Sequence, residues 1–260
     1  MLISLVSACG APGVSTTVLA LSLAWPRPAL LVDADPSGAT TFQAGYLKGE
    51  VTRDRSILDL ALAHRQQRLD EALFTIGIDL PGSTVKLIPG IHSPNQARSL
   101  GPVWPDLARR LQELESNGMD ALVDAGRLGM ADHPHALVAA SDLILLVTRT
   151  QLPGLTAGQT WAGTLREDLT RRGAAHKVGV LVVGPDRPYT VREIETAFNL
   201  PVFATMAWDP VNAEVFSLGS TPSRKFDQSA LNQSARAAAQ SLTNRVFATR
   251  ADLHTPSGAR

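Results

Sequence analysis

The stretch Ser7-Ala8-Cys9-Gly10-Ala11-Pro12-Gly13-Val14-Ser15-Thr16-Thr17 decides the fold. An apolar run over 2–6 precedes it and predicts a buried strand, and an apolar run over 18–24 follows it and predicts a helix. A strand, a tight loop of small residues that ends in hydroxyl side chains, and a helix are the arrangement of a phosphate-binding loop. Residues 1–25 contain no lysine or arginine, so this loop lacks the positive charge that usually contacts phosphate.

Composition narrows the class of protein. The chain has 260 residues, and its 24 lysines and arginines balance 24 aspartates and glutamates, which leaves no overall charge to attract nucleic acid or an acidic membrane. The single Cys9 excludes an internal disulfide and any multi-cysteine zinc or iron–sulfur site within one chain. The apolar run at the N-terminus is too short for a signal peptide or a membrane span, so we expect a cytoplasmic protein.

Apolar runs alternate with segments of helical periodicity along the chain. We expect strands at 2–6, 28–35, 85–90, 119–124, 142–148, 177–183 and 201–206. We expect helices at 18–24, 56–63, 70–74, 104–115, 152–171, 191–199 and 226–248. This alternation predicts an α/β fold of three layers, with helices on both faces of a mostly parallel, twisted sheet of about seven strands. We expect one domain over 1–250 and a flexible tail over 251–260.

Three aspartates follow predicted strands and belong to the same edge of the sheet. Asp33 and Asp35 end the strand at 28–35, and Asp124 ends the strand at 119–124. Ligands of parallel sheets bind at the carboxyl ends of the strands, where the small-residue loop also lies. A single aspartate at a strand end more often caps the next loop, but three beside such a loop favour a magnesium site that includes the Thr16 hydroxyl.

Four stretches, at 7–17, 31–38, 122–124 and 142–147, carry a resemblance to a known family, and it extends over 178–183 and 206–210. They resemble the MinD/ParA family of P-loop ATPases with a deviant Walker motif. The resemblance implies a P-loop NTPase fold, binding of ATP and Mg²⁺, a dimer that sandwiches nucleotide, and slow hydrolysis stimulated by a protein partner. Members of the family position plasmids, chromosomes, division sites, pili or secretion machines.

The same resemblance implies roles for individual residues. The nucleotide would contact Gly10, Ala11, Pro12, Gly13, Val14, Ser15, Thr16 and Thr17 of the loop. Trp208 either borders the base or, like the other tryptophans, is a packing residue. The metal would be held by Thr16, Asp33, Asp35 and Asp124, with Asp35 as the catalytic carboxylate that orients water.

The sequence also departs from the family pattern. Aligning the paired threonines puts Ser15 at the phosphate-contacting lysine and Gly10 at the signature lysine, so both cations are absent. Losing them weakens nucleotide binding and weakens hydrolysis more, because the transition state develops charge that fixed cations stabilise. Arg127, three residues after Asp124, is either a surrogate that reaches the γ-phosphate or a solvated loop arginine. Gly184 stands where the family usually has asparagine near the base.

The C-terminal segment is locally basic. From residue 223 onward the charged residues are Arg224, Lys225, Arg236, Arg245, Arg250 and Arg260 against Asp227 and Asp252. Such a helix either binds DNA without sequence specificity or is simply solvated. It lacks the strongly apolar face of a membrane-binding helix, so we do not expect a membrane role.

Three functions remain open. The first is a nucleotide-binding switch, with weak or absent ATP hydrolysis, that positions or recruits a partner complex in partition, cell division, pilus assembly, secretion or conjugation. The second is a pseudo-ATPase that serves as a constitutive scaffold or homodimeric interaction protein. The third is a metabolic ligase on a related fold, which the absent phosphate lysine argues against.

Overall fold

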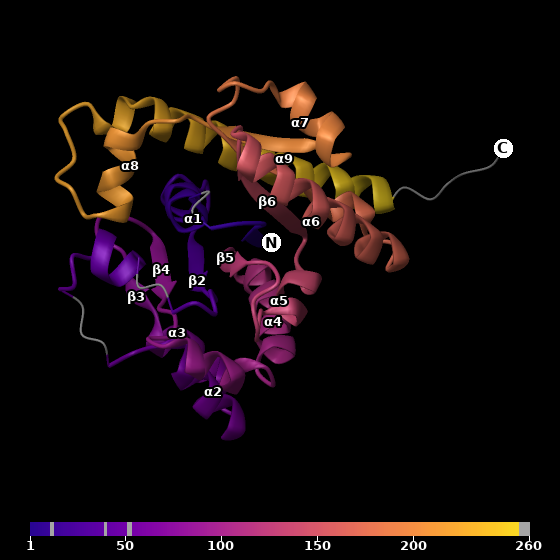
Figure 1. The fold of residues 1–260 in the computed structure, drawn as a ribbon. Coiled ribbons are helices and arrows are strands. Elements are labelled where there is room, and N and C mark those ends of the chain that lie inside the picture. The colour runs from indigo at the N-terminus through magenta and orange to yellow at the C-terminus, as the bar shows by residue number, and fades with distance from the viewer. Residues whose placement is uncertain (11–12, 39–40, 51–53, 255–260) are drawn as a thin grey trace.

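The computed structural model describes residues 1–10, 13–38, 41–50 and 54–254 (Figure 1). Of residues 252–254 it describes the backbone only. Within these residues eight strands form one sheet in the order β3-β4-β2-β5-β1-β6-β7-β8. The strands are β1 (Leu2–Ser7), β2 (Ala29–Asp33), β3 (Ile78–Asp79), β4 (Val85–Ile88), β5 (Asp120–Arg127), β6 (Leu143–Arg149), β7 (Val178–Val183) and β8 (Val202–Met206). All neighbours pair in parallel except β3 and β4.

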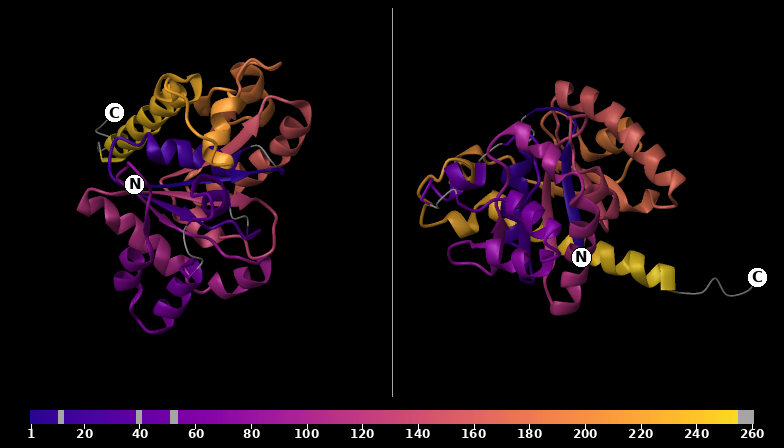
Figure 2. Two further views of the ribbon diagram at one scale, coloured as in Figure 1. Left: turned by 90° about the vertical axis from the view of Figure 1, so that its left-hand side faces the viewer. Right: turned by 90° about the horizontal axis from the view of Figure 1, so that it is seen from below.

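Helices cover both faces of this sheet, which confirms the three-layer α/β fold (Figures 1 and 2). They are α1 (Val14–Leu23), α2 (Ile57–Arg65), α3 (Leu69–Ile76), α4 (Trp104–Glu113), α5 (His135–Ala140), α6 (Leu152–Arg171), α7 (Val191–Phe198), α8 (Pro210–Ser217) and α9 (Ala230–His254). One hydrophobic core lies between the sheet and α2–α7, and the other lies between the sheet and α1, α8 and α9. Strand β1 serves both, with Leu2 and Val6 in the first core and Ile3 and Leu5 in the second.

Three of the differences between the structure and the predicted elements concern a short strand, two short helices and the C-terminal helix. The eighth strand, β3, is only two residues long and carries no apolar run that would mark it. Helices α5 and α8 are six and eight residues long, and neither was predicted. Helix α9 begins after a short 3₁₀ turn at Phe226–Gln228 and continues to His254, past the predicted end at 248 and into the segment expected to be a flexible tail. No helix in the described part of the chain has both the length and the apolar character needed to cross a bilayer.

Helix α1 owes its start to a glycine. Gly13 precedes the helix with φ 94°, a left-handed conformation that side chains with a Cβ rarely adopt. The Thr17 amide donates a hydrogen bond of 2.8 Å to the Gly13 carbonyl, which is the first hydrogen bond of the helical pattern. The first turn contains no acidic residue. The positive end of the helix dipole is therefore not neutralised from within the helix.

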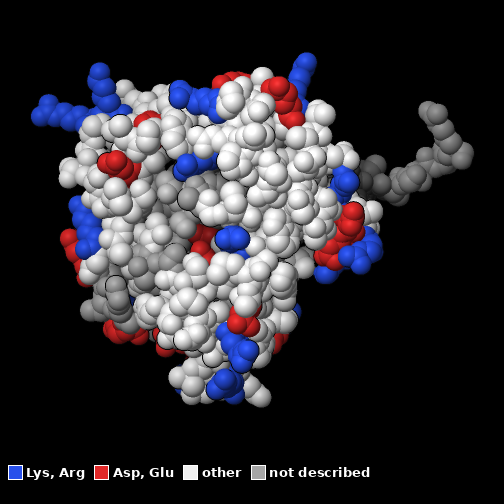
Figure 3. All heavy atoms as spheres, viewed as in Figure 1, with Lys and Arg blue, Asp and Glu red and all other residues white. Residues whose placement is uncertain are grey.

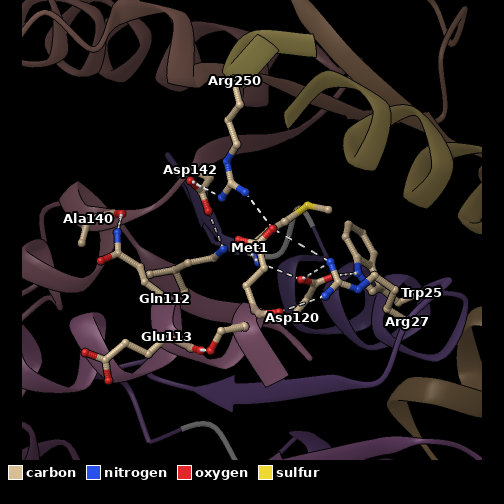
Figure 4. Close-up of polar contacts among 12 residues, drawn as sticks. Met1, Trp25, Arg27, Gln112, Glu113, Asp120, Ala140, Asp142 and Arg250 are labelled. Carbon is tan, nitrogen blue, oxygen red and sulfur yellow. Dashed lines mark hydrogen bonds and ion pairs between the residues drawn. The ribbon is translucent and has the colours of Figure 1, made fainter. Parts of the chain in front are cut away.

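A polar network holds the opposite end of the sheet, where the strands begin (Figure 4). The Met1 amine is fully buried and lies 2.7 Å from Asp120 Oδ1 and 3.1 Å from a Glu115 carboxylate oxygen. Arg250 of α9 donates to Glu115 at 2.7 Å and to Asp142 at 3.0 Å. These bonds tie the C-terminal part of α9 to Glu115, in the 3₁₀ turn Leu114–Asn117 before β5, and to Asp142, the residue before β6.

This network makes stability sensitive to acid. The hydrogen bond from Arg250, followed by that from the N-terminal amine, lowers the pKa of Glu115 from 4.5 to about 2. A depressed carboxyl pKa contributes stability that is present above about 4.5 and is lost as the pH falls toward 2. We expect the free energy of unfolding in urea to fall more steeply from pH 5 to pH 3 in the wild type than in Glu115→Gln. Equal slopes for the two proteins would contradict the pairing.

Candidate functional site at the carboxyl edge of the sheet

The register of the central strands brings the predicted site residues to one edge. Asp124 of β5 lies opposite Asp33 of β2 and Leu5 of β1. The strand at 119–124 was predicted to end at Asp124, but β5 continues to Arg127. Arg127 pairs with Ser7 beyond an irregularity in β1. The residues of β5 after Asp124 therefore lie next to the start of the small-residue loop, because Ser7 is both the last residue of β1 and the first residue of the stretch 7–17.

A cavity of about 490 Å³ opens at this edge. Its lining includes Ser7, Cys9, Gly10, Gly13, Val14, Ser15 and Thr16 from the loop and the start of α1, Asp35, Ser37 and Thr41 from the segment after β2, and Gly126, Arg127 and Met130 from β5 and the segment after it. Most of the predicted nucleotide-contacting residues therefore meet around one space. Thr17 is buried within α1 and does not line it. Ala11 and Pro12 lie outside the described residues.

Asp124 is buried beside this cavity with half of its carboxylate unused. Its Oδ1 accepts a hydrogen bond of 3.0 Å from the Gly126 amide, while Oδ2 has no hydrogen-bond partner among the described residues. Burial, reinforced by the charge of Asp35, raises the pKa of Asp124 to about 7, and the nearby Ser15 hydroxyl opposes that shift. The hydroxyl acts from close by without forming a well-directed bond to Oδ2. A buried acceptor without a donor favours a cation or a hydrogen-bond donor in the space next to it.

Asp33 lies outside the cavity lining and is only 4% exposed. Burial is the main reason that the pKa of Asp33 is raised well above its ordinary value, and the charges of Asp124 and Asp35 add to it. Its Oδ1 accepts a hydrogen bond of 3.3 Å from the Asp35 amide. A Cβ on Gly90 would lie 2.6 Å from the Asp33 carboxyl, so the neighbouring backbone is closely packed against it. In this structure Asp33 orients the backbone of Asp35, and its predicted metal contact stays a prediction.

Asp35 faces the cavity and is held by local bonds. Its Oδ1 accepts a hydrogen bond of 2.8 Å from the Ser37 amide. Gly126 adopts φ +67°, and a Cβ on Gly126 would lie 2.5 Å from the same oxygen of Asp35. The absence of a side chain at 126 is therefore what allows the Asp35 carboxylate to lie against β5. Sequence reasoning missed Gly126, although its position two residues after Asp124 was the available signal.

Replacing Gly126 with alanine tests this close approach. The added Cβ meets Asp35, and a left-handed conformation costs a further 1 kcal/mol or so. We expect Gly126→Ala to lose roughly 2–3 kcal/mol of unfolding free energy, measured in urea. Gly173→Ala is the matched control, because Gly173 has the same φ of +67° but nothing within 4 Å of the added atom. Equal losses in the two variants would show that the contact with Asp35 carries no cost.

Trp208 lies in a separate pocket of about 160 Å³. Gly184 borders the same pocket at φ +71°, and a Cβ on Gly184 would lie 2.9 Å from the Cβ of Trp208. A larger residue at 184 would thus collide with Trp208. Glycine at position 184, where the family usually has asparagine, is therefore compatible with the close approach of Trp208.

The carboxylates at this edge of the sheet fit a magnesium site only if other ligands complete the coordination of the ion. No group of three or more acidic, histidine or cysteine side chains in the described parts of the chain is arranged to hold a metal ion. Mg²⁺ is commonly bound by one or two carboxylates, with waters and substrate phosphates completing its octahedron. Asp35, Asp124 and the Thr16 hydroxyl match that smaller requirement, since Asp35 and Thr16 line the cavity and Asp124 has a free oxygen beside it.

Comparison with known proteins extends the argument from site to fold. No protein-family model matches the sequence, and no curated protein matches it. Among solved structures, a ParA family ATPase from Chlorobium tepidum has a TM-score of 0.71 at 18% identity, over 92% of this chain and 98% of that one. MinD from Pyrococcus horikoshii, complexed with Mg-ADP, has a TM-score of 0.69 at 19% identity, over 93% and 95%.

A third structure, the MinC:MinD cell division complex from Aquifex aeolicus, has a TM-score of 0.70 at 16% identity and covers 94% of this chain and 95% of that chain. At these identities the similarity is one of fold. Together with the sheet order and the loop before α1, it shows that this chain has the fold of the MinD and ParA ATPases.

Proposed function

We propose that this chain is a nucleotide-binding member of the MinD/ParA family, which binds a nucleoside triphosphate and Mg²⁺ in the 490 Å³ cavity and thereby positions or recruits a partner complex. The observation that carries the proposal is the buried Asp124, whose free oxygen lies next to Asp35 and Ser15 at the positive end of α1. The ATPases of the same fold that are named above support the choice of a nucleotide as the ligand and the kind of biological role proposed.

The phosphates would bind at the start of α1. The first amides of a helix have no intrahelical acceptor, and those of Val14, Ser15 and Thr16 belong to this class. With no acid in the first turn, the helix dipole attracts an anion to these amides. Missing a fixed cation costs a few kcal/mol, which shifts affinity by about two orders of magnitude toward millimolar.

The metal would lie between the phosphates and the carboxylates. Mg²⁺ would be held, directly or through water, by Asp35, Asp124 and the Thr16 hydroxyl. Asp33 would help to position Asp35 by accepting a hydrogen bond from the Asp35 amide. Bound Mg²⁺ would supply positive charge to the phosphates, and Asp35 would orient a water molecule. Arg127 lines the cavity and is exposed, so it would be available as a surrogate for part of the missing lysine charge, and a solvated loop arginine is the alternative. Without a lysine in the loop, hydrolysis is expected to be weak or absent.

The output would be a protein–protein interaction. One structure of the same fold is a MinC:MinD complex, which supports a protein partner, and a homodimer is part of the same proposal. DNA binding through α9 has less support, because Arg250 pairs with two carboxylates and the Arg245 guanidinium lies 3.6 Å from the Phe203 ring. On the face shown in Figure 3, charges of both signs are scattered rather than gathered in one patch.

A pseudo-ATPase scaffold is the second candidate, and the absence of any lysine or arginine from residues 1–25 is what favours it. Titration calorimetry with ATP and with ADP, each with and without Mg²⁺, separates the two. The nucleotide-binding proposal predicts heat with Mg–ATP up to millimolar concentration. No heat at millimolar nucleotide would overturn it in favour of the scaffold. Equal phosphate release by the wild type and Asp35→Ala would remove hydrolysis from the proposal but leave binding.

A further inference from the structure

Arg149 lies beside the cation-free loop although it is distant in sequence. It is the last residue of β6 and pairs with Val183 of β7. Strand β6 runs next to β1, with Val147 opposite Ser7. Arg149 is thus two residues further along, at the level where β1 gives way to the loop. The Cys9 thiol of that loop is close enough to act on the charge of Arg149.

No carboxylate among the described residues forms an ion pair with the Arg149 guanidinium. It lies 4.4 Å from the Trp208 ring, and its buried Nε has no hydrogen-bond partner among the described residues. Burial lowers the pKa of Arg149, and no carboxylate contributes to that pKa. Arg250, which is about as buried, meets the carboxylates of Glu115 and Asp142. A partly desolvated arginine without a counterion is an arrangement that an anionic ligand completes.

A second arginine, Arg187, lines the pocket that contains Arg149. The 160 Å³ pocket is lined by Arg149, Thr150, Gln151, Val183, Gly184, Arg187 and Trp208, and none of these is acidic. The Thr150 hydroxyl lies within hydrogen-bond distance of the carbonyl groups of Gly184 and Arg187 and shares its one proton between them, which connects the segment that carries Arg187 to the end of β6. Two arginines and one tryptophan therefore meet in a pocket with a fixed frame.

We propose that Arg149 is a phosphate-binding residue, which reaches from the end of β6 to the phosphates of the nucleotide and supplies the charge that the loop lacks. The proposal rests on the proposed function. In this structure the guanidinium lies over the Trp208 ring in a cation–π contact, which is weaker than a charge-assisted bond to a phosphate oxygen. Phosphate binding draws Arg149 from the ring toward Cys9. Arg187 remains at the pocket and adds to the positive potential.

Affinity as a function of phosphate number tests this assignment. We would measure dissociation constants for adenosine, AMP, ADP and ATP, with Mg²⁺, in the wild type, Arg149→Gln and Arg149→Lys. Arg149→Gln is expected to weaken ATP binding by about tenfold to a hundredfold and to leave adenosine binding unchanged. Arg149→Lys, which keeps the charge, is expected to recover part of the loss. The tryptophan fluorescence of the chain, to which Trp208 contributes together with three other tryptophans, should change on ATP binding in the wild type and less in Arg149→Gln.

Arg192→Gln is the control, because Arg192 is an exposed arginine on α7 whose loss changes the net charge equally. If the wild type binds ATP and Arg149→Gln binds it as tightly, the assignment of Arg149 is wrong and the proposed function stands. If Arg149→Gln weakens adenosine as much as ATP, Arg149 is structural and not a phosphate ligand. If the wild type binds none of the four ligands, the proposed function fails and takes this inference with it.

Discussion

Replacing Asp124 with asparagine is expected to stabilise the protein in the absence of nucleotide and to weaken Mg²⁺-dependent nucleotide binding. Asp124 is 1% exposed, and burial raises its pKa to about 7. A carboxyl whose pKa rises on folding costs stability, and the cost grows from pH 4 to pH 7 and is constant above that range. Asparagine keeps the oxygen that accepts from Gly126 and removes the charge. We expect a gain of roughly 2–4 kcal/mol at pH 8 and much less at pH 5.

The loss of binding in Asp124→Asn has the same origin. The free Oδ2 is the group that we assign to the metal, and a neutral amide is a poor replacement for a carboxylate at Mg²⁺. We expect at least a tenfold weaker affinity for Mg–ATP, with nucleotide binding in the absence of metal unchanged. A residue that served only the fold would show the opposite pattern. If Asp124→Asn destabilised the protein at pH 8, the buried charge would not be the strained group that the structure indicates.

Replacing Asp120 with alanine is expected to cause the largest loss of stability. Asp120 is fully buried, and its two oxygens bind the Met1 amine at 2.7 Å and the Trp25 indole at 2.9 Å (Figure 4). Arg27 lies 3.3 Å from the same carboxylate. Removing the anion leaves a buried ammonium group without its nearest partner, which costs about 3–5 kcal/mol. That is a large part of the 5–15 kcal/mol that typically holds a domain together.

Asp79→Ala is the matched control for Asp120→Ala. Asp79 also forms an ion pair, with Lys86, but its side chain is 79% exposed. Exposed pairs contribute about 1 kcal/mol or less, so urea unfolding should barely change. Similar losses from Asp79→Ala and Asp120→Ala would show that the N-terminal network does not hold the sheet. Nucleotide binding should survive in both variants at temperatures where they are folded, because the network lies at the opposite end of the strands.

The sequence predicted the fold well because the fold depends on long apolar patterns. The seven predicted strands all exist, and helix α6 begins and ends at the predicted residues. The misses are elements that periodicity cannot mark. Strand β3 is two residues long, and α5 has six residues and no capping side chain. Helix α8 begins at Pro210 after Asp209, whose side chain accepts from the Asn212 amide, so a capping signal was present there but too little apolar pattern followed.

The site was predicted in outline and missed in detail. Strand ends share an edge by topology, so Asp35, Asp124 and the loop were expected to meet, and the structure places them around one cavity or directly beside it. Which side of the edge each residue faces depends on register and local bonds. The hydrogen bond from the Asp35 amide and the tight contact with Gly90 go with the position of Asp33 outside the cavity. Arg149 was missed because only strand order brings β6 beside the loop.

Counting metal and nucleotide on the same protein tests the central claim most directly. Equilibrium dialysis with Mn²⁺ in place of Mg²⁺, and with labelled ATP, gives the number of each bound per chain. The wild type is expected to bind no stoichiometric Mn²⁺ alone and one Mn²⁺ together with one ATP, because its carboxylates need phosphate oxygens to complete the coordination. Asp124→Asn should lose that ion. Binding of Mn²⁺ without ATP, or full retention of the ion by Asp124→Asn, would contradict a shared metal–nucleotide site at this edge of the sheet.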